Sequence, residues 1–150
     1  MQELYKEIVL DHWQRPRNQG ELPGAEIEEH INNPLCGDEV TVYANLRDGN
    51  VAELSFTGRG CSISQASASM MTDQLLGKSY EEAEAEVERF KAMMVGKEDF
   101  PEAEDLAALK GVIKYPSRIK CATLAWIAFQ KGLLEQQKRK ALGPYIGEST

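Results

Sequence analysis

Three cysteine residues, each set in a short and unusual motif, are the side chains of this sequence best suited to chemistry. They are Cys36 in Asn-Pro-Leu-Cys-Gly-Asp, Cys61 in Gly-Arg-Gly-Cys, and Cys121 in Arg-Ile-Lys-Cys. Because 25 and 60 residues separate them, only the tertiary fold can bring them together. If it does, Asp38 can add a fourth ligand. Three thiolates and one carboxylate form a tetrahedral set that suits zinc or the edge of an iron–sulfur cluster.

The surroundings of each cysteine favour the thiolate, which is the form that binds metals. Cys36 is expected on a glycine-containing turn that would leave it accessible. Cys61 is expected at the start of a helix, where unpaired backbone N–H groups and the helix dipole stabilise an anion. Cys121 is expected in the first turn of the last helix, and the positive charges of Arg118 and Lys120 beside it act in the same direction.

The net charge of such a site bears on its reactivity. A zinc ion (+2) bound by three thiolates and the Asp38 carboxylate (−4 together) would leave a net charge of −2, which Arg118 and Lys120 can offset. A carboxylate is also a weaker partner for a soft metal than a fourth thiolate. We therefore expect an exchangeable site, in which a partner side chain could displace one ligand and free a cysteine to react.

A simpler interpretation is that the cysteines only fill the core. Free cysteine is among the most frequently buried residue types, and spacing alone does not separate packing from metal binding. The only histidines, His12 and His30, have no metal-type partner at short spacing. We expect His12 to pack or to face solvent, and we identify no serine, histidine and aspartate arrangement typical of a hydrolase.

Length and composition indicate an ordinary globular chain. Of its 150 residues, 42% are hydrophobic and 27% charged, so we expect one domain over residues 1–150, with a flexible polar tail from about Gln136. The net charge of −7 argues against a nucleic-acid partner. The sequence contains neither a recognisable signal peptide nor an apolar run long enough to cross a membrane. An odd number of cysteines then predicts reduced thiols in the cytoplasm.

Alternating side chains predict an antiparallel hairpin. Its expected buried positions are Val40, Val42, Ala44 and Leu46, followed by Ala52, Leu54 and Phe56. Asp48 and Gly49 lie between the two strands and supply the positive φ angles that a tight turn needs. A third strand is expected near residues 25–31.

Helical periodicity accounts for the other expected elements. The expected helices cover residues 2–13, 62–76 and 80–95, a short stretch near 102–109, and a last helix from about Arg118 into the 130s. Ser79 and Glu82 are spaced as a capping box for the helix that follows them. The many alanines and serines of residues 62–76 would let neighbouring backbones approach this helix closely.

Five motifs together resemble the IscU/SufU family of iron–sulfur cluster assembly proteins, and they extend over nearly the whole chain. They are Leu4-Tyr5, Asp11-His12-x-x-x-Pro16-Arg17-Asn18, Asn33-Pro34-x-Cys36-Gly37-Asp38, Gly58-x-Gly60-Cys61-Ser62-Ile63-Ser64-x-Ala66-Ser67-Ala68-Ser69, and Arg118-Ile119-Lys120-Cys121-Ala122-Thr123-Leu124-Ala125. The long segment 77–117 between the second and third cysteines resembles the insertion of the SufU branch. Lys120 before the third cysteine, where IscU-type scaffolds have histidine, also resembles that branch.

This resemblance implies an α+β fold, in which a small antiparallel β-sheet packs against several α-helices and the three cysteines gather at one end. It implies a zinc site formed by Cys36, Asp38, Cys61 and Cys121. It also implies that Cys36 accepts sulfur from the persulfide of a SufS-type cysteine desulfurase, assisted by Asp38 and Arg118. In the family mechanism a histidine of the desulfurase replaces Cys36 on zinc, which leaves a free thiolate to attack the persulfide.

Three functions remain open at this point. The leading hypothesis is a zinc-dependent sulfur acceptor, a sulfurtransferase-type partner of a desulfurase rather than a stand-alone enzyme. The second is a scaffold that assembles a labile [2Fe-2S] cluster, or binds iron, on Cys36, Cys61 and Cys121 and passes it to downstream iron–sulfur assembly proteins. The third is a protein whose zinc site is purely structural, in which case loss of Cys36 would unfold the domain.

Overall fold

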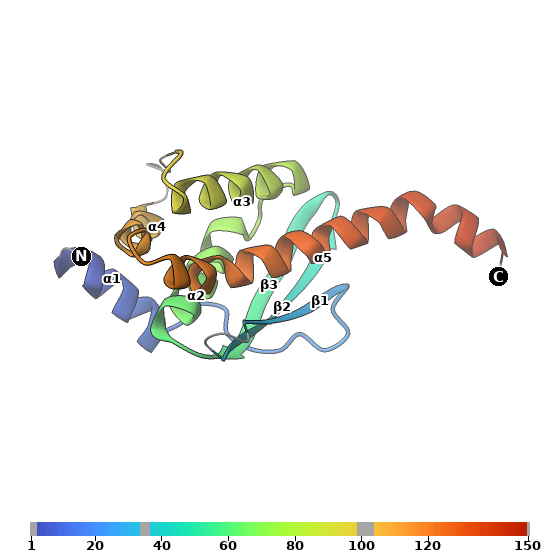
Figure 1. Cartoon of the computed structure of the whole chain (residues 1–150). Helices are drawn as coiled ribbons and strands as arrows, with labels where there is room; N and C mark the ends of the chain where they lie inside the picture. The colour runs from blue at the N-terminus through green and yellow to red at the C-terminus, as the bar shows by residue number, and fades with distance from the viewer. Residues whose placement is uncertain (1–2, 34–36, 99–103, 150) are drawn as a thin grey trace.

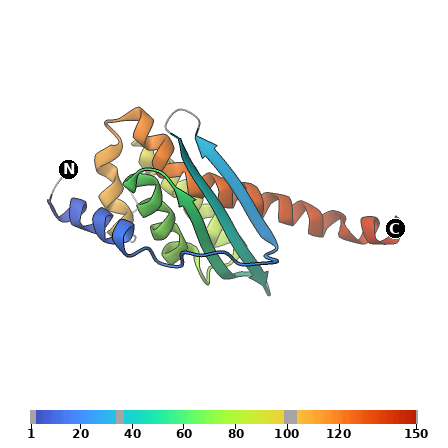
Figure 2. The same ribbon diagram turned by 90° about the horizontal axis from the view of Figure 1, so that it is seen from below.

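The fold is built on a three-stranded antiparallel sheet with the strand order β1-β2-β3. The strands are β1 (Ile27–Asn33), β2 (Asp38–Arg47) and β3 (Asn50–Arg59). The computed structural model describes the backbone of residues 3–33, 37–98 and 104–149, and the side chains of 6–33, 37–98 and 105–139. The expected α+β class is confirmed, because α2, α3 and α5 lie on one side of the sheet (Figures 1 and 2).

The predicted hairpin is present, with one difference in its buried face. Asp48 and Gly49 adopt φ angles of 53° and 79° at its tip, as expected. A bulge near the tip shifts the register, so that Leu46 pairs with Val51. Val51 is therefore fully buried, whereas the predicted core position Ala52 is only partly buried. An alternating pattern cannot reveal such a bulge, because one extra residue exchanges the two faces of a strand.

The helices closely follow the expected ranges. Their bounds are α1 (Glu3–Gln14), α2 (Ser62–Leu75), α3 (Tyr80–Met94), α4 (Glu104–Ala107), the 3₁₀ helix η1 (Ala108–Val112) and α5 (Pro116–Ser149). The capping box at the start of α3 is confirmed, since Ser79 and Glu82 exchange side-chain and backbone hydrogen bonds.

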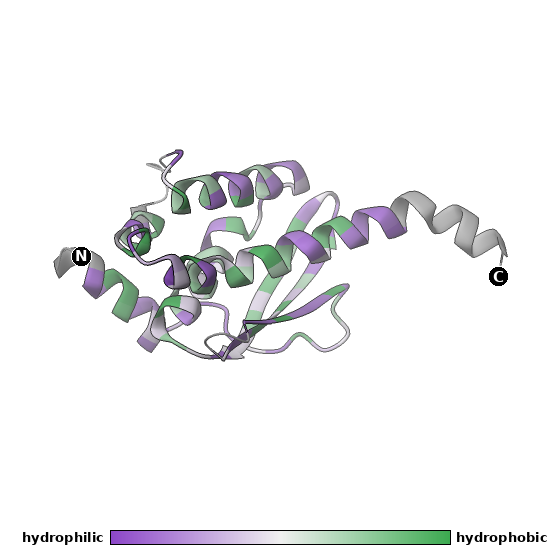
Figure 3. Ribbon diagram, in the orientation of Figure 1, coloured by the Kyte–Doolittle hydropathy of each residue, from purple (hydrophilic) through white to green (hydrophobic). Residues whose placement is uncertain are grey.

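The last helix is longer than expected at both ends. It begins at Pro116 and continues to Ser149, well past the 130s, and its distal part extends away from the sheet (Figure 1). Hydrophilic residues cover much of this extension where its side chains are described (Figure 3). The division of the chain into one domain and a flexible tail remains a prediction.

The core lies between the sheet and the helices. On α2, Ala66 and Ala68 are fully buried, so the small side chains do allow neighbouring helices to approach closely. Phe90 of α3 stacks on Trp126 of α5 with 4.1 Å between ring centroids and 11° between ring planes, and both side chains are fully buried. None of the helices in the described part of the chain is both long enough and apolar enough to cross a membrane.

The close packing of α5 on β1 depends on Gly132. A Cβ atom at this position would lie 2.4 Å from Cγ2 of Ile27 and 2.8 Å from Cγ of Glu29. The approach places Glu29, whose side chain is 16% exposed, between α5 and the sheet. Burial raises the pKa of Glu29, the hydrogen bond and negative charge of Glu135 raise it further, and the charges of Lys131 and Arg139 act in the opposite direction.

The replacement Glu29→Gln should stabilise the fold at neutral pH. Because the pKa of Glu29 is higher in the folded state than its ordinary value of 4.5, its stabilising contribution is fully present below the unfolded pKa and is lost as the pH rises through the folded pKa. A neutral glutamine avoids that loss. Urea unfolding at pH 7 should give a larger free energy of unfolding for the variant, and the gain should disappear at pH 4.

The exposed Glu28 on the same strand offers a matched control. We expect no comparable gain from Glu28→Gln. Two results would contradict the prediction: equal effects of the two replacements, or a gain from Glu29→Gln that persists unchanged at pH 4. Either would show that the packing of Glu29 against α5 has no influence on its titration.

Candidate metal centre

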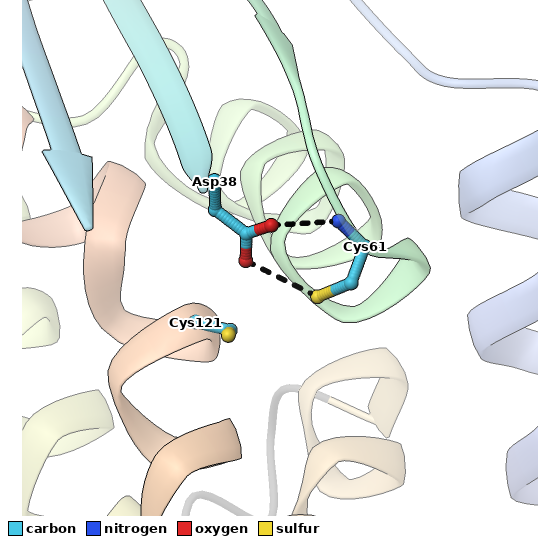
Figure 4. A group of neighbouring side chains, drawn as sticks. All are labelled: Asp38, Cys61 and Cys121. Atoms are coloured by element: carbon cyan, nitrogen blue, oxygen red, sulfur yellow. Dashed lines mark hydrogen bonds between the residues drawn. The ribbon is translucent and has the colours of Figure 1, made fainter. Parts of the chain in front are cut away.

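Three of the four predicted ligands converge at one end of the sheet (Figure 4). Asp38 is the first residue of β2, Cys61 directly precedes α2, and Cys121 lies near the start of α5. One ligand atom from each residue lies within 4.8 Å of the other two. The fourth predicted ligand, Cys36, lies outside the described residues.

Asp38 connects the sheet to the start of α2. Its carboxylate is buried, with Oδ1 accepting a hydrogen bond from the backbone N–H of Cys61 at 2.8 Å and Oδ2 accepting one from Cys61 Sγ at 3.2 Å. Negative charge is favourable at a helix N-terminus, where backbone N–H groups have no partner within the helix. Because the backbone N–H already occupies Oδ1, Oδ2 is the oxygen that faces the sulfur atoms.

Gly60 leaves the space that this carboxylate fills. A Cβ atom at residue 60 would lie 2.2 Å from Asp38 Oδ1 and 2.9 Å from its Cα, which is closer than atoms can approach. The φ angle of Gly60, +147°, is one that other residues rarely adopt. The Gly-x-Gly-Cys motif therefore has a geometric explanation that the sequence alone does not provide: the second glycine lets an aspartate approach the start of the helix.

Cys121 is buried in the second turn of α5. We expected it in the first turn, and that expectation is wrong because α5 begins two residues earlier, at Pro116. Proline is well suited to the first helical position, where a backbone N–H would have no partner. The Cys121 thiol lies 3.5 Å from the backbone oxygen of Ser117, one turn before it.

An open cavity of about 640 Å³ adjoins the three side chains. Arg118 and Lys120 line it together with Asn33 and are exposed to solvent. Among the residues whose side chains are described, no acidic group forms an ion pair with Arg118 or Lys120. These two cations are therefore available to offset negative charge in the cavity, as the sequence led us to expect.

The donor atoms fit a thiophilic metal ion. Two sulfur atoms and one carboxylate oxygen, drawn from three separate elements, are ligand types that zinc accepts, and a tetrahedral ion would require one more ligand. Asp38, Cys61 and Cys121 line an open cavity. Packing in the core therefore does not by itself account for their positions. In the described part of the chain, this is the one group of three or more histidine, cysteine and acidic side chains close enough to hold a metal ion.

The structure also contains a serine, histidine and aspartate arrangement that the sequence analysis missed. His12 lies 2.8 Å from Ser69 Oγ through Nδ1 and 2.6 Å from Asp105 Oδ2 through Nε2. Ser69 is fully buried, so it cannot serve as a nucleophile for a substrate. The arrangement instead ties α1 to α2 and α4. No local motif could have revealed it, because 57 and 93 residues separate the partners from His12.

Comparison with known proteins gives consistent matches. The chain matches the family model of the NifU-like N terminal domain over residues 4–141. It is 44% identical over 136 residues to the zinc-dependent sulfurtransferase SufU of Bacillus subtilis (strain 168), covering 89% of this chain and 92% of the relative. It is 42% identical over 132 residues to the iron-sulfur cluster assembly scaffold protein IscU of Streptococcus pyogenes serotype M1, covering 87% and 82%.

Solved structures show the same fold. The crystal structure of a hypothetical protein superimposes with a TM-score of 0.82 and 41% sequence identity, covering 89% of this chain and 98% of that chain. That of a putative iron-sulfur cluster assembly scaffold protein for the SUF system from Fervidobacterium islandicum AW-1 gives a TM-score of 0.80 and 33% identity, covering 85% and 94%.

The replacement Gly60→Ala should displace Asp38 and lower stability more than a comparable change elsewhere. Gly77→Ala is a suitable control, because Gly77 also has a positive φ angle (+84°) but nothing within 4 Å of an added Cβ. Backbone strain alone should cost the control about 1–2 kcal/mol. Gly60→Ala should cost clearly more in urea unfolding. It should also weaken the binding of added Zn²⁺ relative to the control in a metal titration. Equal losses in the two variants would contradict the close approach of Asp38.

Proposed function

Because the chain belongs to the NifU-like N-terminal domain family, which includes the SufU and IscU proteins, we propose that it serves in iron–sulfur cluster assembly as a zinc-dependent sulfur acceptor. Its sulfur donor would be the persulfide of a SufS-type cysteine desulfurase, and its acceptors would be downstream assembly proteins. The observation that carries the proposal is the convergence of Asp38, Cys61 and Cys121 beside an open cavity lined by cations.

Cys36 is the proposed sulfur acceptor. It precedes Asp38 by two residues, so covalent geometry limits the distance between their Cα atoms to about 7 Å. Asn33 and Asp38 pair across β1 and β2 and both line the cavity, so the chain enters and leaves the segment that contains Cys36 at the cavity wall. This proximity of Cys36 to Asp38 along the sequence supports its assignment as the fourth ligand and the acceptor.

The proposed chemistry is an exchange between a thiolate and a persulfide. The Cys36 thiolate attacks the outer sulfur of the desulfurase persulfide, the sulfur–sulfur bond of the donor breaks, and the donor cysteine leaves as a thiolate. Cys36 then carries the persulfide. Zinc bound by Cys36, Asp38, Cys61 and Cys121 would hold the Cys36 thiolate unreactive until a partner side chain takes its place among the ligands.

Asp38 and Arg118 have supporting roles in this proposal. The hydrogen bond to the Cys61 backbone holds the Asp38 carboxylate at the site even when another ligand leaves. Arg118 is exposed at the cavity wall, where its guanidinium can pair with the anionic sulfur groups of donor and acceptor during transfer.

Assembly of a [2Fe-2S] cluster is the second candidate function. It is favoured by the 42% identity to a relative named as an IscU scaffold. Cys36, Cys61 and Cys121 would bind the cluster, and the same cavity would admit a protein to which it is passed on. The two functions share ligands, so the metal content of the protein must decide between them.

The variant Cys36→Ala should abolish sulfur acceptance without unfolding the protein. The thiol is required as the nucleophile, whereas the core of the described residues is formed by other side chains. The measurement is sulfide release by a cysteine desulfurase in the presence of each variant, with circular dichroism as the check on folding. If folded Cys36→Ala protein stimulates the desulfurase as fully as the wild type, Cys36 is not the acceptor. If the variant unfolds, the zinc site is structural.

Metal analysis of protein purified without added metal should separate the two functions. We expect about one zinc per chain, no iron chromophore and a faster desulfurase. Iron with acid-labile sulfide, a transferable cluster chromophore and little effect on the desulfurase would instead establish the scaffold function.

A further inference from the structure

Two of the candidate ligands belong to helices that no backbone hydrogen bond joins to each other in the described part of the chain. Cys61 precedes α2 and Cys121 lies in α5, so side-chain contacts between the two helices help to set their separation. Only a few buried residues make the hydrogen bonds between α2 and α5 in the described part of the chain. A metal site binds well only when its ligands are held at fixed distances, so the contacts between the two helices must hold them in one arrangement.

Ser67 makes one such contact, to the residue that follows Cys121. Its hydroxyl donates to the backbone oxygen of Ala122, the residue after Cys121, at 2.5 Å. The Ser67 hydroxyl oxygen in turn accepts a hydrogen bond from Trp126 Nε1 at 3.0 Å. Ser67, Ala122 and Trp126 are all fully buried. With both its donor and its acceptor role used, the hydroxyl has one orientation, and it fixes α5 at two points one turn apart.

The long segment between the second and third cysteines supports this contact. Trp126 stacks on Phe90 of α3, and this contact holds the indole ring in place. A chain of buried contacts therefore runs from Phe90 through Trp126 and Ser67 to the backbone beside Cys121. Loss of the Ser67 hydroxyl would leave the Trp126 N–H buried without this acceptor, which is unfavourable enough to shift the helices.

We propose that Ser67 is a positioning residue that sets the distance between the two sulfur ligands Cys61 and Cys121. It acts through α5 and does not touch the metal or the sulfur. The inference rests on the proposed function only in assuming that these cysteines bind a metal ion. It assigns to α3 a part in the site, because the Phe90 stack keeps Trp126 in position for Ser67.

Ser69 provides a matched control on the same helix. It is also a fully buried serine whose hydroxyl makes two hydrogen bonds, but these go to the backbone N–H of Arg17 and to His12. Removal of either hydroxyl should lower stability through the loss of buried hydrogen bonds. Only removal of the Ser67 hydroxyl should disturb α5, and with it the sulfur of Cys121.

The experiment is a titration of metal-free protein with Co²⁺, read from the thiolate–cobalt and ligand-field absorption bands, followed by competition with Zn²⁺. Wild type, Ser67→Ala, Ser69→Ala and Trp126→Phe are compared at a temperature where circular dichroism shows each to be folded. We expect Ser67→Ala to lose about tenfold or more in metal affinity and to change the band shape, as supporting residues of metal ligands typically do. The metal affinity of Ser69→Ala should stay within about twofold of wild type, because the Ser69 hydroxyl bonds to His12 and Arg17 and not to α5.

Trp126→Phe keeps the stack on Phe90 and the bond from Ser67 to Ala122 but removes the N–H donor. It should give an intermediate loss of affinity, and it tests the proposal even if Ser67→Ala does not fold. Unchanged affinity in Trp126→Phe and Ser67→Ala, or an equal loss in Ser67→Ala and Ser69→Ala, would overturn the positioning role while leaving the proposed function intact. Absence of thiolate–cobalt bands in the wild type would remove the metal site, and both proposals with it.

Discussion

The hydrogen bond from the Cys61 backbone to Asp38 is the interaction on which the arrangement of this site depends. It fixes the first residue of β2 against the residue that begins α2, and so joins the sheet to the helical layer. The bond is short and charge-assisted, and it lies where the helix N-terminus favours negative charge. It forms only because residue 60 has no side chain. One carboxylate thus serves both the fold and the candidate metal centre.

The central helix α2 makes the other hydrogen bonds that fix the surrounding elements. Its N-terminal end meets Asp38, Ser67 bonds to α5, and Ser69 bonds to His12 and the chain after α1. Small side chains let its neighbours come close enough for these bonds to form. Buried hydroxyl groups without partners would be costly, so each bond also selects one arrangement of the helices. The result is a rigid support for the ligands beneath a cavity that stays open to a partner.

An exchangeable site needs this combination of rigidity and access. Asp38, Cys61 and Cys121 are held by regular elements, whereas Arg118 and Lys120 face solvent at the cavity wall. Positive charge at the entrance favours anionic sulfur groups, and the carboxylate is the weakest of the expected ligands for a soft metal. An open cavity beside the ligands would admit a partner side chain to the proposed site, which a purely structural zinc site does not require.

The sequence by itself determined the elements and the chemical types of the ligands, because periodicity, turn residues and capping act over a few residues. It predicted the hairpin turn at Asp48 and Gly49, the capping box of α3, and Asp38 with the cysteines as candidate ligands. Only the tertiary structure decided which groups meet. The place of Asp38 beside Gly60, the bulge that buries Val51, and the contact of Ser67 with α5 all depend on packing between segments distant in the chain, and no local pattern encodes such contacts.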